Sequence, residues 1–191
     1  MTIYRALIGA FWLLFIAVWV AAAFGAKQSL GSRARWRERV LPFVAIALFV
    51  LALRTPVISH ALRHARAYIV NTDPHLGVAG VVLCALGIGL AIWARIYLGR
   101  NWGLPMTRKE HPELITSGPY AYVRHPIYSG IMLAMLGSAI AETFVWLVPL
   151  ALVGVYFIYS ARAEERLMAQ EFPQAYSAYR KRTKMLVPFL L

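Results

Sequence analysis

The apolar positions of this chain fall into four long blocks that are nearly free of charge. The blocks cover residues 6–26, 40–59, 75–95 and 127–161. A helix needs about 20 residues to cross about 30 Å of hydrocarbon, so each of the first three blocks predicts one span. The fourth block is too long for a single helix, and its only acidic residue, Glu142, divides it in two. It therefore predicts a helical hairpin that turns at Glu142 and Thr143. The pattern predicts an all-α, polytopic integral membrane protein with about five transmembrane helices, including this C-terminal hairpin.

The composition agrees with a membrane protein. Apolar residues make up 60% of the chain and charged residues only 15%, which is far from the balance of a soluble domain. The formal net charge of +12 comes from basic residues that flank the apolar blocks. They do not form a stripe with aromatic residues between them, so we expect the lipid bilayer as partner and no nucleic acid. The first block is longer than the core of a signal peptide, which predicts a retained helix.

The basic residues also predict an orientation. Most of the 20 Lys and Arg residues fall in the segments 27–39, 95–126 and 162–184. Five spans place these three segments on one side of the membrane, and cytoplasmic segments are enriched in Lys and Arg. We therefore predict a multi-pass protein of the bacterial cytoplasmic membrane, with its N-terminus outside and its C-terminus in the cytoplasm.

Small residues in two of the blocks predict close helix packing. The third block has glycines that lack the spacing and the preceding strand of a dinucleotide-binding fingerprint; they are Gly77, Gly80, Gly87 and Gly89. The fourth block has a stripe of small residues with a spacing of four, namely Gly130, Ala134 and Ser138. Small residues let helix backbones approach each other in a membrane, so we expect both sets at helix contacts.

No metal or disulfide chemistry is predicted. The single cysteine, Cys84, lies inside an apolar block, where we expect it to be buried as a small hydrophobic residue. His60 and His64 have a spacing that could hold a metal ion, but Arg63 and Arg66 would repel a cation. We interpret this segment as a basic helix at the membrane interface.

The segment "GPYAYVRHPIYSG", residues 118–130, places charge directly before an apolar helix. Gly118 favours a turn, and Pro126 suits the first position of a helix. Arg124 and His125 would then flank a helix N-terminus, where free N–H groups attract anions. The alternative is that Arg124 only anchors the helix at the membrane surface and the neighbouring tyrosines form an interfacial aromatic belt.

The segment after the last apolar block adds acidic side chains at the same face. Glu164 and Glu165 lie a few residues beyond the block, where a carboxylate is costly unless it is paired or used in function. Pro173 breaks the helix, and Tyr176 and Tyr179 share one face of a second short helix. A cationic corner and an acidic pair at one membrane face predict a cytoplasmic pocket for a ligand with both charges.

These motifs resemble a known family. The runs "LGRNWG", "HPELITSGPYAYVRHPIYSG" and "EERLMAQEFPQAYSAYRKRTKMLVPF" are similar to the isoprenylcysteine carboxyl methyltransferase family in its shorter prokaryotic form, which is related to the membrane phospholipid methyltransferases. The resemblance divides the chain into N-terminal transmembrane helices, 1–94, and a methyltransferase-like region, 95–191. It implies an enzyme that uses S-adenosylmethionine and methylates the carboxylate or thiolate of a lipid-like acceptor, a lipophilic small molecule or a prenylated protein, that enters from the bilayer.

The resemblance also implies site residues. Those that match the cofactor-binding positions of the family, together with the adjacent Arg124, are Leu114, Ile115, Tyr120, Arg124, His125, Pro126, Tyr128 and Glu164. The substrate arginine of the family aligns with Ser160, and Arg162 is the candidate to replace it. Glu165 and His125 are the candidate bases for an amine acceptor. No metal ligand is implied.

Three alternative functions stay open. The first is a phospholipid or isoprenoid methyltransferase of the same superfamily. The second is an NADPH-dependent membrane reductase, because some sterol reductases resemble this C-terminal half. The third is a membrane scaffold without catalytic activity, in which the charges only orient the helices.

Overall fold

The computed structural model describes residues 2–23, 71–99 and 113–187. The predicted span at 40–59 and the histidine pair at 60 and 64 lie outside these ranges. Within them the regular structure is helical, apart from one isolated parallel bridge between Val123 and Lys184. The helices are α1 Thr2–Ala23, α4 Pro74–Leu98, η3 Gly118–Ala121, α5 Pro126–Ala141, η4 Phe144–Trp146, α6 Leu147–Glu171 and α7 Pro173–Arg182. The prediction of an all-helical membrane protein is confirmed.

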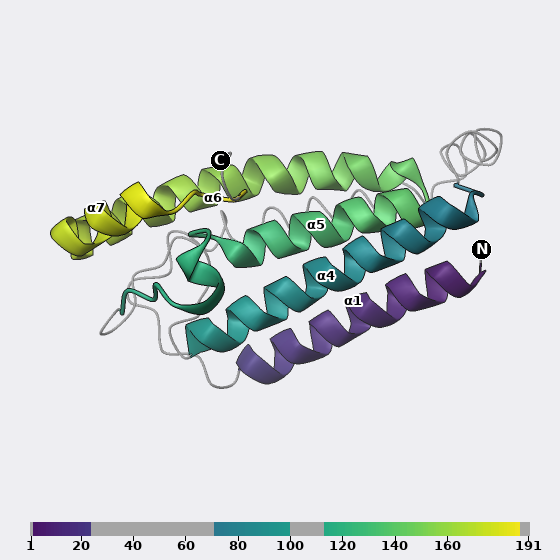
Figure 1. Cartoon of the computed structure of the whole chain (residues 1–191), viewed down its shortest axis with the longest axis horizontal. Helices are drawn as coiled ribbons and strands as arrows, with labels where there is room; N and C mark the ends of the chain where they lie inside the picture. Colours follow the sequence, from purple (N-terminus) through teal and green to yellow (C-terminus); the bar gives the residue numbers. More distant parts are fainter. Residues whose placement is uncertain (1, 24–70, 100–112, 188–191) are drawn as a thin grey trace, which may run out of the picture.

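The four long helices run along one axis, in the order α6, α5, α4 and α1 across the bundle (Figure 1). Among the described residues, three helices are long and apolar enough to cross a membrane, at Ile3–Ala21, Pro74–Leu98 and Phe144–Glu171. The 25 residues of α6 rise about 38 Å, which exceeds the hydrocarbon thickness. The 16 residues of α5 rise only about 24 Å. The charged end of α6 therefore has room to extend beyond the apolar layer beside the start of α5.

The turn of the hairpin lies where the sequence predicts it. Glu142 ends α5, and Thr143 begins the short helix η4 with its hydroxyl accepting from the amide of Val145 at 3.3 Å. The indole of Trp146 donates to the Glu142 carboxylate at 3.1 Å. The acidic residue that interrupts the apolar block thus closes the turn between α5 and α6.

Helices α4 and α5 are antiparallel and in backbone contact. A Cβ atom added at Gly87 would lie 2.4 Å from the Ala134 nitrogen, and one added at Gly137 would lie 2.4 Å from the Cys84 nitrogen. An added Cβ would lie 2.4 Å from the Ala141 nitrogen at Gly80 and 2.6 Å from the Gly87 oxygen at Gly130. The predicted role of the small residues is therefore confirmed for these positions. At Gly89 an added Cβ would meet nothing within 4 Å among the described residues, so this glycine makes no close contact with α5 and its role in packing stays a prediction.

Helix α1 is attached to this pair by a tryptophan. The indole of Trp12 donates to the Ser138 hydroxyl at 3.1 Å and stacks on Trp146 with ring centroids 5.9 Å apart. The Ser138 hydroxyl in turn lies 3.8 Å from the Cys84 sulfur. Cys84 is fully buried, as predicted. Ser138 thus serves as a polar contact to α1, while the neighbouring Gly137 carries the close contact to α4.

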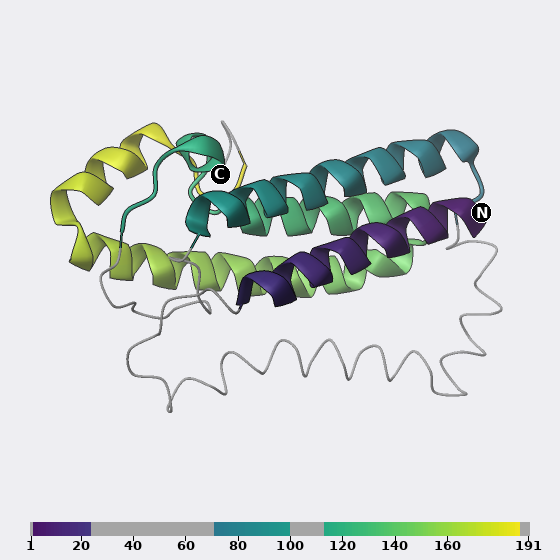
Figure 2. The same ribbon diagram turned by 90° about the horizontal axis from the view of Figure 1, so that it is seen from below.

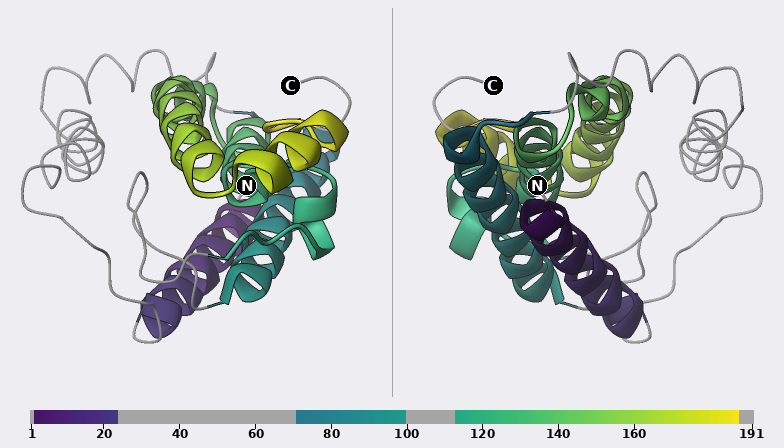
Figure 3. Two further views of the ribbon diagram at one scale, coloured as in Figure 1. Left: turned by 90° about the vertical axis from the view of Figure 1, so that its left-hand side faces the viewer. Right: turned by 90° about the vertical axis from the view of Figure 1, so that its right-hand side faces the viewer.

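The two ends of the bundle differ. The N-terminus of α1 and the start of α4, which the Asp73 carboxylate caps at 2.8 Å from the His75 amide, lie at one end (Figure 2). The start of α5, the end of α6, η3 and α7 lie at the other. After α6, Phe172 and Pro173 begin α7, which folds back over the bundle end (Figure 3). Tyr176 and Tyr179, which the sequence places on one face of a second short helix, are its buried residues.

Candidate functional site

The turn before α5 places the predicted cationic corner. Gly118 has φ 60°, and an added Cβ would lie 2.4 Å from the Tyr97 ring, so both the backbone and the space require glycine. The η3 turn that follows buries Tyr120. Pro126 then occupies the first position of α5, with no amide proton to leave unpaired. Arg124 and His125 are thereby fixed at the start of this helix, as predicted.

Arg124 lies at the centre of a buried charge cluster. Its Nε donates to the Glu165 carboxylate at 2.6 Å, and both side chains are 9% exposed. Its Nη1 donates to the carbonyls of Thr183 and Arg180. The guanidinium therefore joins the start of α5, the end of α6 and the end of α7. A pair that is this well buried and hydrogen-bonded holds its geometry far better than a surface ion pair.

His125 lies between the two acidic residues. Its Nδ1 is 3.5 Å from Glu164, and its Nε2 is 3.5 Å from Glu165. Burial alone would lower the pKa of this imidazole, but the two carboxylates outweigh burial and raise the pKa above its ordinary value. Within the described parts of the chain, Nε2 is buried without a hydrogen bond of good geometry. A buried polar atom without a partner can form a hydrogen bond with a bound ligand.

Tyr128 connects the cluster to the apolar core. Its hydroxyl donates to Glu164 at 2.5 Å. Its ring stacks on His125 with centroids 5.5 Å apart and on Phe157 with centroids 4.2 Å apart. The tyrosine thus fixes the distance between α5 and α6 directly below the charged groups.

The two carboxylates of α6 differ in environment. Glu165 is 9% exposed and is held by Arg124, His125 and, at 3.7 Å, by Arg180. Glu164 is 28% exposed and contacts only Tyr128 and His125 among the described side chains. Glu165 therefore organises the cluster, whereas Glu164 keeps a face toward solvent that a ligand can reach.

The segment after α7 lies against the start of α5; we call residues 183–186 the strap. The amides of Arg124 and His125 donate to the carbonyls of Lys184 and Met185 at 2.8 and 3.1 Å. The Ser129 hydroxyl donates to the Leu186 carbonyl. Met185 and Leu186 are buried in the apolar cluster around Tyr128 and Phe157. The strap therefore consists of paired backbone on one side and buried apolar side chains on the other.

Tyr120 is held by α7 and faces a buried cation. The Tyr179 hydroxyl donates to the Tyr120 carbonyl at 2.6 Å. Burial raises the pKa of the Tyr120 phenol, the neighbouring Tyr179 and Glu164 raise it further, and Arg95 acts in the opposite direction. Arg95, at the end of α4, is only 5% exposed and donates to the Gly99 carbonyl at 2.7 Å. This arginine, predicted only as part of a basic segment, lies inside the site region.

Three predicted residues lie outside the charge cluster. Leu114 and Ile115 are half-buried in the irregular segment before η3. Arg162 is exposed on α6 and takes part in none of the ion pairs of the cluster. Ser160, which occupies the substrate-arginine position, is fully buried, and among the described residues its hydroxyl has no hydrogen-bond partner. Their assignment as site residues stays a prediction.

The sequence did not point to Arg180 or to the strap carbonyls. Arg180 is one of several consecutive basic residues, and nothing in its type distinguishes it from Lys181 or Arg182. Backbone carbonyls carry no side-chain signal at all. The remaining predicted members, from Arg124 to Tyr128 and at Glu164 and Glu165, do lie together at one bundle end. No group of three metal-ligating side chains occurs in the described residues.

Comparison with known proteins agrees with this arrangement. The phospholipid methyltransferase family profile matches residues 76–175, just over half of the chain. The chain belongs to the phospholipid methyltransferase family. The match includes α4, α5, α6, Arg124 and both carboxylates, and it begins earlier than residue 95, where the predicted methyltransferase-like region starts. This earlier start fits the backbone contact that makes α4 and α5 one unit.

The individual proteins that this chain resembles have two kinds of name. The cobalt-zinc-cadmium resistance protein CzcN of Cupriavidus metallidurans is 33% identical over 118 residues, 60% of this chain and 49% of the relative. Protein-S-isoprenylcysteine O-methyltransferase B of Arabidopsis thaliana is 32% identical over 122 residues, 58% of each chain. The corresponding enzyme of Schizosaccharomyces pombe is 31% identical over 112 residues, 56% of this chain and 47% of the relative. The family resemblance recognised in the sequence is therefore confirmed. The chain spans about half the length of the curated relatives it matches.

Proposed function

We propose that this chain is an S-adenosylmethionine-dependent membrane methyltransferase, similar to isoprenylcysteine carboxyl O-methyltransferases, whose acceptor is a lipid-like carboxylate or thiolate from the bilayer. The observation that carries the proposal is the buried cluster of Arg124, His125, Tyr128, Glu164 and Glu165 at one bundle end. Membership of the phospholipid methyltransferase family favours methyl transfer over a nicotinamide-dependent reductase or a scaffold.

The residues present fit the proposed methyl donor. S-Adenosylmethionine has a carboxylate, an ammonium group and a sulfonium, and it supplies an activated methyl group when it is bound. The cluster offers cationic donors at Arg124 and His125 for the carboxylate and an accessible acceptor at Glu164 for the ammonium or ribose hydroxyls. The buried His125 Nε2 that lacks a hydrogen bond within the described residues is consistent with a site that a ligand completes.

The residues of the chain would act by aligning the methyl donor with the acceptor and by excluding water from the site. In the proposed reaction the acceptor oxygen or sulfur forms the new bond to the methyl carbon while the carbon–sulfur bond breaks and its electron pair stays on sulfur. No proton moves when the acceptor is a carboxylate or thiolate, so the site needs alignment and a dry environment rather than a base. Glu165, bound to Arg124 at 2.6 Å, suits a positioning role in this scheme. Pro126 and Tyr128 hold the start of α5, and Leu114, Ile115 and Tyr120 are the family-matched positions in the segment before it.

A direct experiment measures methyl transfer to a lipid acceptor and binding of the cofactor product. The full chain, purified in mild detergent, is incubated with methyl-labelled S-adenosylmethionine and a bacterial lipid extract, and the labelled product is identified by mass spectrometry. Calorimetric titration of S-adenosylhomocysteine then tests Glu164→Gln, which keeps the shape of the side chain and loses its charge. Loss of one charge-assisted hydrogen bond costs about 1.5–3 kcal/mol, so the affinity should fall about 10- to 150-fold.

The matched control for this substitution is Glu142→Gln. Glu142 lies at the hairpin turn, at the opposite end of α5 from His125, and its substitution makes the same chemical change. It should leave the affinity for S-adenosylhomocysteine unchanged. If both variants bind like the wild type, the cluster does not hold the cofactor and its charges only anchor the helices. Failure to bind S-adenosylhomocysteine in the wild type would refute the cofactor assignment itself.

A further inference from the structure

The end of α7 carries a dense group of cations that the proposed reaction does not use. Arg180, Lys181, Arg182 and Lys184 fall within five positions, and all four are exposed. Residues 173–187 contain no Asp or Glu. Of the four, only Arg180 takes part in the ion pairs of the cluster, at 3.7 Å from Glu165, and it remains 66% exposed. We call Lys181, Arg182 and Lys184 the basic end of α7.

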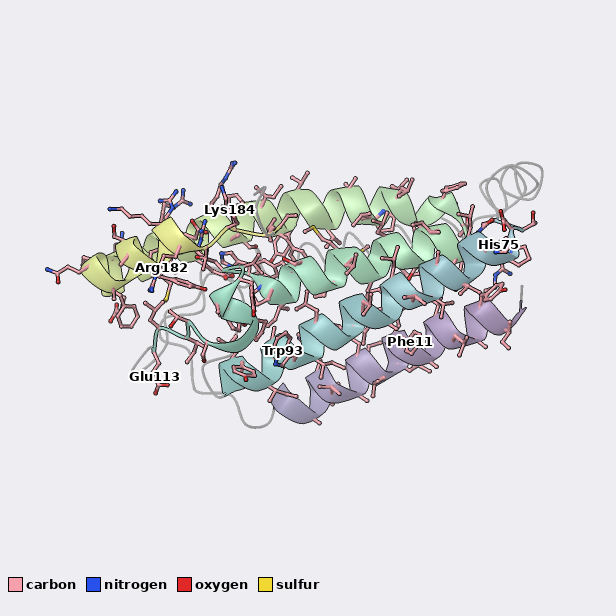
Figure 4. All side chains as sticks on the ribbon, in the orientation of Figure 1. Phe11, His75, Trp93, Glu113, Arg182 and Lys184 are labelled. Carbon is pink, nitrogen blue, oxygen red and sulfur yellow. The ribbon has the colours of Figure 1, made fainter. Side chains whose placement is uncertain are left out.

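The basic end lies at the level where the bundle becomes apolar. The strap that follows α7 pairs with Arg124 and His125, two residues and one residue before α5 begins, so the cations return to the start of an apolar helix. Figure 4 shows Arg182 and Lys184 at this end of the molecule and His75 at the opposite end. Cations at the boundary of the apolar layer face the headgroup region of the bilayer, and each contributes to attraction toward anionic lipids.

The same segment is hydrogen-bonded to the charge cluster. Lys184 belongs to the basic end by its side chain and to the strap by its carbonyl, which accepts from the Arg124 amide at 2.8 Å. Arg124 also donates to the Thr183 carbonyl and pairs with Glu165. A lipid surface that holds the basic end therefore also holds the carbonyls that fix Arg124.

We propose that anionic lipid headgroups bind the basic end of α7 and thereby keep the strap docked against the start of α5. The partner is the lipid phosphate surface of the membrane in which the chain is embedded. We choose anionic lipid as the partner because of charge complementarity. The basic end presents three exposed cations, and the surrounding segment has no acidic residue, so it matches a surface of phosphodiesters. This proposal does not depend on the identity of the methyl donor or acceptor.

Binding can be measured on the full chain in detergent. A fluorescent phosphatidylglycerol is titrated by anisotropy and then displaced by unlabelled phosphatidylglycerol, phosphatidylcholine or inorganic phosphate. Phosphatidylglycerol should compete, and the other two should not. Each removed cation should weaken binding about 5-fold at low salt, so Lys181→Gln/Arg182→Gln/Lys184→Gln should weaken it on the order of 100-fold. Arg182→Gln alone is compared with Arg166→Gln, an exposed arginine of α6 outside both the cluster and the basic end.

Strap docking is measured separately by amide hydrogen exchange in nanodiscs. The peptides of interest cover 122–126, where the amides of Arg124 and His125 are bonded to the strap. Exchange should slow several-fold when one third of the phosphatidylcholine is replaced by phosphatidylglycerol, and the triple variant should not respond. Equal exchange in both lipids would overturn the proposal. So would wild-type lipid affinity in the triple variant, equal losses in Arg182→Gln and Arg166→Gln, or displacement by inorganic phosphate as efficient as by the lipid.

Discussion

Replacement of Gly87 by alanine tests the closest contact in the bundle. The added Cβ would lie 2.4 Å from the Ala134 nitrogen, 2.5 Å from the Gly130 oxygen and 2.9 Å from the Ala134 Cα. All three atoms are backbone, so no side chain can rotate away. Ordinary van der Waals contact begins at 3.4 Å, and α4 must therefore move about 1 Å away from α5.

The energetic effect follows from this displacement. A gap of about 0.5–1 Å removes a quarter to a half of the dispersion energy of each atom pair that it separates. Overpacking of this kind costs about 1–3 kcal/mol, while alanine regains up to about 1 kcal/mol of helix propensity over glycine. Gly89 provides the matched control, because an added Cβ there meets nothing within 4 Å in the parts of the chain that the structure describes. Both substitutions gain the same helix propensity, so this contribution drops out when the two variants are compared. Gly87→Ala should therefore have a free energy of unfolding about 1–3 kcal/mol lower than that of Gly89→Ala.

The measurement is unfolding of the full chain by sodium dodecyl sulfate in mixed micelles, followed by tryptophan fluorescence. Gly89→Ala should be as stable as the wild type or slightly more stable, and Gly87→Ala should unfold at a lower detergent fraction. Gly137→Ala, whose Cβ would lie 2.4 Å from the Cys84 nitrogen, should behave like Gly87→Ala. If Gly87→Ala and Gly89→Ala differ by less than about 0.5 kcal/mol, the helices are not in backbone contact and the packing argument is wrong.

Three further changes test other contacts. Trp12→Phe removes the 3.1 Å bond to Ser138 and should cost about 0.6–1.7 kcal/mol of unfolding free energy; Ser138→Ala should then cost little more in that background, whereas additive losses would disprove the pair. Because the folded-state pKa of His125 lies above its ordinary value, its charge stabilises the fold fully at low pH and less as pH rises through the raised pKa. The deficit of His125→Gln should therefore shrink above neutral pH, and a deficit that grows with pH would contradict this. Tyr179→Phe loses the bond to the Tyr120 carbonyl and should cost about 1 kcal/mol, measured by the same unfolding assay; no loss would place that bond outside the folded core.

Much of the helical framework could be predicted because its causes are local in the sequence. Glu142 interrupts an apolar block, and the hairpin turns there; Pro126 suits a first helical position, and α5 begins there. The spacing of Tyr176 and Tyr179 predicts that they share one helix face, and that face is buried. The presence of a glycine does not tell which side of the helix it faces: Gly87 contacts α5, whereas Gly89 has no close neighbour among the described residues.

The candidate site could be predicted only by residue type. The sequence brings cations and carboxylates to one membrane face, but the partner of each charge depends on how α5, α6 and α7 are placed in three dimensions. Glu164 and Glu165 are adjacent in sequence and about 100° apart around the helix, so small rotations of α6 decide which one meets Arg124. The strap is bound through its backbone carbonyls, which every residue has. No pattern of side chains could have indicated it.

The position of the strap along the chain has a consequence for biosynthesis. Its partners at Arg124 and His125 precede α6, while the strap follows α7, so the chain must complete both helices before these backbone bonds can form. The apolar helices can enter the membrane one after another during translation without it. Insertion and maturation of the charge cluster are therefore separate events in time. A product interrupted between α6 and the strap would be embedded in the bilayer with Arg124 deprived of its carbonyl partners, and membrane insertion alone would be a poor measure of correctly assembled protein.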